Sequence, residues 1–131
     1  MPLTISILDE TSSGERIAAG SLEVDLETAT LRDLIRRRIQ REVEAFNQSE
    51  RETFQGLVQP EESERTLNGY RLNERRLLDW QKQYEKAILS FERNGFLVLL
   101  DDRQVTDLDE VLRLSPASEI HFLKLTPLVG G

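Results

Sequence analysis

Apolar and polar residues alternate at the start of the chain. Leu3, Ile5 and Ile7 alternate with other residues, which is the period-two pattern of a strand with one buried face. A second alternation covers 22–26, where leucine and valine share one face and the acidic residues share the other. Turn-forming residues at 9–14 separate the two patterns. This region therefore predicts a β-hairpin.

A helical spacing replaces the alternation after residue 30. Thr30 offers a side-chain oxygen that can cap a helix, and Asp33 follows three residues later. We expect an amphipathic helix over 31–47, whose apolar stripe covers the inner face of a small sheet. The stripe consists of Leu31, Leu34, Ile35, Ile39, Val43 and Phe46.

Residues 48–70 lose this periodicity and are rich in Ser, Glu and Gln, which predicts a polar, partly mobile connection. Asn73 is the expected cap of a second helix over about 73–94, which Asn94 and Gly95 end. This helix either packs on its own domain or binds a partner. Its apolar stripe consists of Leu77, Trp80, Tyr84, Ala87, Ile88 and Phe91.

Short elements follow the second helix. The apolar run at 96–100 predicts a buried strand that ends in a turn at Asp101 and Asp102. Residues 104–105 predict a brief strand, residues 108–112 a helical turn, and residues 120–125 the last strand. We expect a flexible tail over about 126–131, in which the glycines lack a Cβ and can enter a narrow channel.

Length and composition restrict the function classes. We expect 131 residues to form a single domain over 1–131. A formal net charge of -7 disfavours binding to nucleic acid and to anionic membranes. With no cysteine, no signal peptide and no membrane span in the sequence, we expect a cytoplasmic protein. A single histidine and the lack of a phosphate-binding motif predict no metal site, no bound cofactor and no catalytic residues.

When residues 48–94 are left out, the order of the expected elements matches that of the β-grasp fold. The residues themselves resemble the ubiquitin-like protein modifier family. Ser-Leu-Glu-Val-Asp (21–25), Thr-Leu-Arg-Asp-Leu (30–34) and Arg-Ile-Gln (38–40) resemble ubiquitin's second strand and helix. Leu-Leu (99–100), Arg-Gln-Val (103–105) and Ile-His-Phe-Leu (120–123) resemble its third strand, following turn and last strand. The resemblance implies an α+β fold, a mixed sheet packed on one helix, with a long helical insertion between the first helix and the third strand.

The resemblance also implies a chemistry for the tail. Gly131 would supply a carbonyl that an ATP-using activating enzyme adenylates and transfers to a cysteine, and Gly130 would let it enter the enzyme. Pro127 stops strand pairing, and Leu128 and Val129 complete a tail that lacks ubiquitin's basic residues, which favours a bacterial protein. The implied partners are activating-like and conjugating-like enzymes, a deconjugating protease and target proteins.

Strand alternation predicts a surface that these partners would bind. If the neighbouring residues on each strand point inward, Leu99, His121 and Leu123 point outward. The alternative is that the inserted helix covers them. Two other functions stay open, namely a sulfur carrier with a C-terminal thiocarboxylate and a β-grasp interaction module that is not conjugated.

Overall fold

The structure is a computed structural model that describes residues 2–11, 13–67 and 69–125. The chain divides into two units. The sheet unit comprises residues 1–34 and 90–131, and the insert unit comprises residues 35–89. Within the described ranges the protein is α+β, with two helices, a mixed five-strand sheet and two smaller sheets.

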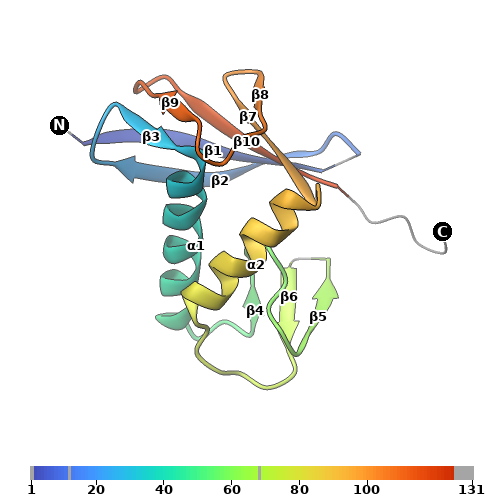
Figure 1. The fold of residues 1–131 in the computed structure, drawn as a ribbon. Coiled ribbons are helices and arrows are strands. Elements are labelled where there is room, and N and C mark those ends of the chain that lie inside the picture. The colour runs from blue at the N-terminus through green and yellow to red at the C-terminus, as the bar shows by residue number, and fades with distance from the viewer. Residues whose placement is uncertain (1, 12, 68, 126–131) are drawn as a thin grey trace. The chain divides into compact units, whose positions relative to one another are not determined.

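The five-strand sheet lies in the sheet unit and has the order β2-β1-β10-β7-β8 (Figure 1). The last strand runs parallel to the first, and the other neighbouring pairs are antiparallel. The strands are β1 (Leu3–Thr11), β2 (Arg16–Val24), β7 (Phe96–Leu100), β8 (Arg103–Val105) and β10 (Glu119–Lys124).

The inner face of this sheet carries the apolar residues that the alternation predicts. Ile5, Val98 and Phe122 are fully buried, and the rings of Phe96 and Phe122 lie 6.0 Å apart. The predicted strands over 96–100 and near 104–105 and 120–125 are confirmed. The predicted second strand is wrong at its end, because β2 stops at Val24 and Leu26 is 67% exposed.

A second sheet in this unit pairs β3 (Thr28–Thr30) with β9 (Val111–Arg113). The helical turn expected over 108–112 is therefore wrong. Leu112 and Leu114 are buried while Val111 is exposed, which is the alternation of a strand and not of a helix. The segment is ambiguous in the sequence because Leu108, Val111 and Leu112 have helical spacing, whereas Leu112 and Leu114 have the spacing of a strand.

Helix α1 (Leu31–Asn47) has the bounds that the spacing predicts. Thr30 Oγ1 accepts a hydrogen bond from the backbone N–H of Asp33 at 3.1 Å, so the expected cap is confirmed. All of the predicted stripe is buried, namely Leu31, Leu34, Ile35, Ile39, Val43 and Phe46.

The polar connection expected over 48–70 is wrong, because this region contains three strands. They are β4 (Thr53–Phe54), β5 (Ser63–Thr66) and β6 (Gly69–Leu72), in the order β4-β6-β5. Polar side chains hold the backbone between the strands. Glu42 Oε2 accepts the N–H of Leu57 at 2.9 Å, and Ser63 Oγ donates to the carbonyl of Pro60 at 2.6 Å. Such bonds leave no periodic signal in the sequence.

Helix α2 (Trp80–Glu92) starts seven residues later than the expected helix over 73–94. The predicted cap, Asn73, instead donates its backbone N–H to the carbonyl of Glu62. Asp79 is the cap, since its Oδ1 accepts the N–H of Gln81 at 2.9 Å. The predicted stop is confirmed, because Asn94 has a φ of 61° and the Gly95 N–H returns to the carbonyl of Ser90.

Candidate functional site

The strand register brings the three predicted surface residues onto one face of the five-strand sheet. His121 on β10 lies directly opposite Leu99 on β7, and Leu123 lies opposite Leu97. On its other side, His121 lies opposite Leu8 of β1. Directly opposite residues point to the same face, and this is the face away from the buried Phe122. We call this group the outer patch: Leu8, Leu97, Leu99, His121 and Leu123.

The outer patch is only partly accessible. Its leucines are half-buried, and His121 is 9% exposed because it lies on a central strand between Leu8 and Leu99. The prediction that His121, Leu99 and Leu123 bind a partner stays a prediction. Sequence reasoning missed Leu8 and Leu97, although Leu8 is out of phase with Ile5 and Ile7 and so has the parity of the outer face.

Polar residues border the outer patch on both sides. Glu10 lies opposite Leu123, and Gln104 lies opposite Leu99. Arg16 Nε donates to Glu10 Oε1 at 3.0 Å, and this bond and the carboxylate charge raise the pKa of Arg16. The outer patch thus has four leucines around His121 and a polar rim, and a mostly apolar centre with a polar rim is usual for protein-binding surfaces.

A cavity of about 490 Å³ continues from this edge of the sheet and includes Leu97 and Gln104 in its lining. At its other side, Arg32 forms an ion pair with Asp109, with Nε 3.0 Å from Oδ1. The pKa of Asp109 lies below its usual range, mainly because Arg32 donates a hydrogen bond to it and secondly because Arg32 carries a positive charge. The backbone N–H of Arg32 also donates to the carbonyl of Leu108 at 2.9 Å, which fixes the start of α1 to this loop.

The predicted tail residues lie outside the described residues. They are Pro127, Leu128, Val129, Gly130 and Gly131. Strand β10 ends at Lys124, and the backbone N–H of the following residue, Leu125, donates to the carbonyl of Gly95 at 3.2 Å.

Over 2–11, 13–67 and 69–125, no group of His, Cys, Asp and Glu side chains is arranged to hold a metal ion. The same residues include no helix that is long and apolar enough to cross a bilayer. Comparison with known proteins gives no relatives: no protein-family model, no curated protein and no solved structure matches this chain.

Proposed function

We propose that this chain is a ubiquitin-like protein modifier with a β-grasp fold, conjugated to target amines through the carboxylate of Gly131. The observation that carries the proposal is the order of the five-strand sheet, in which the first and last strands are parallel neighbours. Without residues 48–94, the strands of the five-strand sheet and α1 follow one another as the hairpin β1–β2, helix α1, strands β7 and β8, and the central strand β10. Strands β3 and β9 lie between these elements in the chain and form the separate two-strand sheet. This order supports the β-grasp that the sequence resemblance implies, and β10 leads toward Gly130 and Gly131.

The proposed chemistry is done by other proteins. A carboxylate is a poor electrophile, so the activating enzyme joins Gly131 to the AMP part of ATP and releases pyrophosphate. A cysteine thiolate of the enzyme then attacks the carbonyl, and AMP leaves. The target amine attacks the thioester, a C–N bond replaces the C–S bond, and the thiol is released. This chain supplies the carbonyl and no catalytic residue or bound cofactor.

The outer patch is the surface that we propose for docking the activating and conjugating enzymes. Its half-buried leucines supply apolar contact area, and Glu10 and Gln104 supply polar contacts at the rim. Leu99→Glu should therefore weaken transfer to the enzyme thioester by about tenfold, a typical loss for a central interface residue. Leu26→Glu is the matched control, because Leu26 is an exposed leucine outside the sheet of the same unit.

The direct experiment is intact-mass analysis of the protein co-expressed with the products of its neighbouring genes. Protein adducts that disappear when Gly131 is deleted, and persist in Leu26→Glu, support the modifier. A gain of one sulfur in place of one oxygen at Gly131 identifies a sulfur carrier instead. If neither species forms with a competent activating enzyme, the chain is an interaction module and the proposal fails.

A further inference from the structure

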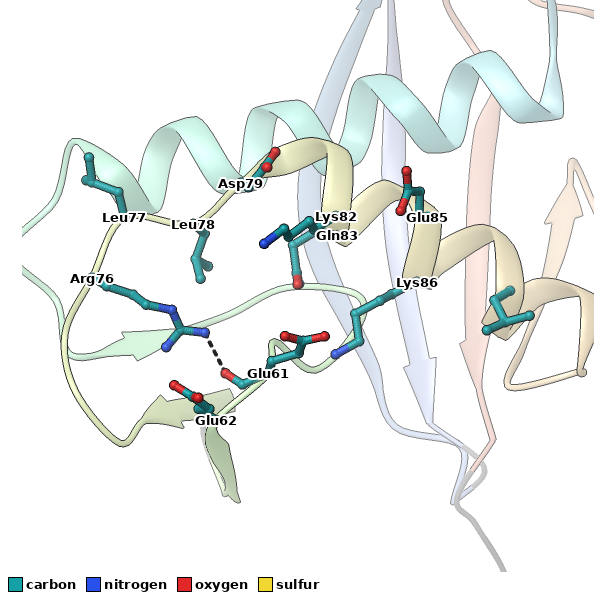
Figure 2. Close-up of a pocket in the computed structure, with 11 residues that line it drawn as sticks. Glu61, Glu62, Arg76, Leu77, Leu78, Asp79, Lys82, Gln83, Glu85 and Lys86 are labelled. Carbon is teal, nitrogen blue, oxygen red and sulfur yellow. Dashed lines mark hydrogen bonds between the residues drawn. The ribbon is translucent and has the colours of Figure 1, made fainter.

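The insert unit contains a cavity of about 510 Å³ between α2 and the segments around 61–62 and 76–79 (Figure 2). This volume lies within the usual range of about 300–1,000 Å³ for ligand sites. All of the lining residues belong to the insert unit, so the cavity is independent of the sheet unit and of the proposed modifier function.

Gln83 supplies a hydrogen-bond acceptor in this cavity. Its side chain is 4% exposed, and its Nε2 donates to the carbonyl of Val58 at 3.2 Å. A carbonyl can only accept, so this bond fixes which end of the amide is oxygen. Gln83 Oε1 has no hydrogen-bond partner among the described residues, yet no buried side-chain oxygen there is unsatisfied, so Oε1 is accessible. Figure 2 shows the side chain directed from α2 into the cavity.

Two half-buried cations line the same cavity. Arg76 Nη2 donates to the carbonyl of Glu61 at 2.6 Å, and Lys86 Nζ donates to the carbonyl of Gln59 at 2.9 Å. Neither cation forms an ion pair with a carboxylate in the part of the chain that the structure describes. Neutral carbonyls therefore hold both cations in place without cancelling their charge.

Depth separates the charges of the lining. Gln83 and Leu78 are buried, and the two cations are half-buried. The other charged residues of the lining are exposed, namely Lys82 and the acidic residues Glu61, Glu62, Asp79 and Glu85. An anionic group is favoured at the inner part of the cavity, and a second anion is disfavoured at the rim. Gln83 and Lys86 are three residues apart on α2, which places their Cβ atoms about 5–6 Å apart on one helix face.

We propose that this cavity binds the C-terminal residue of a partner peptide. A peptide C-terminus carries a carboxylate for Arg76 and Lys86, and its own backbone N–H is adjacent and donates to Gln83 Oε1. Its apolar side chain contacts Leu78. A simple anion lacks the N–H donor, and an internal peptide segment lacks the carboxylate beside that donor.

The test is an NMR titration of the full chain with an acetylated tetrapeptide that ends in leucine, against the same peptide with a C-terminal amide. We expect the free acid to shift the Gln83 side-chain amide signals and the backbone signals of 76–89. The amide should bind at least about tenfold more weakly, because it lacks the charge-assisted hydrogen bonds. Lys86→Gln and Arg76→Gln should each weaken binding of the acid by about tenfold. Arg65→Gln is the matched control, since Arg65 is an exposed arginine of β5 outside the cavity.

Several outcomes overturn the assignment. If the peptide acid and the peptide amide bind with equal affinity, the carboxylate has no role. If acetylated leucine binds as tightly as the tetrapeptide acid, the site holds a small acylated amino acid and not a peptide. NMR signal shifts that lie outside the insert unit also reject the proposed site. So does a lack of binding at about 5 mM peptide, because the Kd would then be weaker than that of most specific complexes. Gln83→Glu should abolish binding by repulsion. If this variant does not fold, the Lys86 and Arg76 variants decide the result.

Discussion

The interactions that stabilise the interior of the sheet unit differ in kind from those that stabilise the interior of the insert unit. In the sheet unit, five strands pair through their backbones, and their alternating apolar residues form the core. In the insert unit, the described strands have at most four residues, and long polar side chains hydrogen-bond to loop carbonyls. Arg75 alone donates to the carbonyls of Phe46, Ser49 and Arg51, and its guanidinium lies 4.2 Å from the centre of the Phe46 ring.

The insert unit also buries apolar side chains, such as Ile39, Phe54 and Leu72, but a few polar side chains fix its loops. Asn47 accepts the N–H of Leu78 at 2.8 Å and donates to its carbonyl at 2.9 Å, so one amide fixes the segment before α2. In the sheet unit the backbone pairing is regular, and the stabilisation is distributed over many apolar contacts, each of which is small. Single polar substitutions in the insert unit should therefore destabilise only the loops near them. Apolar truncations in the sheet unit should destabilise that unit as a whole.

The largest expected effect is in the sheet unit. Phe122→Ala removes a fully buried ring from the central strand and should lower the free energy of unfolding by about 3–5 kcal/mol. Leu123→Ala, on the outer face of the same strand, is the control and should cost less because Leu123 is half-buried. Urea denaturation of both variants checks this. Equal losses would contradict the inner and outer assignment of β10.

A glycine comparison tests how closely the insert unit is packed. Gly56 is buried, and an added Cβ would overlap the ring of Phe54 and lie 2.7 Å from Glu42 Oε2. Gly56→Ala should therefore cost about 1–3 kcal/mol through overpacking. Gly14→Ala in the sheet unit meets nothing within 4 Å, and only its φ of 89° is unfavourable, so about 1 kcal/mol is expected. Thermal unfolding of the two variants ranks them, and the reverse order would refute close packing at Gly56.

Arg75→Lys tests the polar attachment of the loops. Lysine keeps the charge but cannot reach several carbonyls with a planar fork of donors, so we expect a loss of about 1–2 kcal/mol. Amide hydrogen exchange should accelerate over 46–51 while β1 and β10 keep their protection. Arg71→Lys, at an exposed position of β6, is the control. Faster exchange in β1 and β10 as well would show that the two units do not respond separately.

The smallest expected effects are pH-dependent and opposite in sign. The folded-state pKa of Asp109 in the sheet unit is lowered by Arg32, so its stabilisation is complete above the unfolded value of about 3.9 and is lost as the pH falls through the folded value. The pKa of Tyr70 in the insert unit is raised by burial. Its contribution is complete below about 10 and is lost as the pH rises through the folded value.

Asp109→Asn and Tyr70→Phe test these two directions. The first should reduce the acid sensitivity of the denaturation midpoint, and salt should reduce the difference because Asp109 is exposed. The second should reduce the alkaline sensitivity, which ultraviolet absorbance of the phenol can follow alongside unfolding. If both variants keep the pH dependence of the wild type, Asp109 and Tyr70 are not the groups that cause it.

The sequence predicted the elements whose signals are periodic or local. The stripe from Leu31 to Phe46 gave the bounds of α1, and Asn94 gave the end of α2. It did not predict β4 to β6, because bonds such as that of Glu42 to the Leu57 N–H join residues fifteen positions apart and need the fold to be known. For the outer patch, alternation predicted the orientation of Leu99 and His121, but the inclusion of Leu8 depends on the parallel register of β1 and β10.

Peptide mass spectrometry of purified conjugates tests the proposed modification most directly. The chain would be incubated with ATP and its activating and conjugating enzymes, and the products would be digested with trypsin, which cleaves after Lys124. We predict target peptides in which a lysine Nζ is joined to the carbonyl of Gly131 and carries residues 125–131. Conjugates that lack this branched peptide, or that are joined through another residue of the chain, would contradict the proposal.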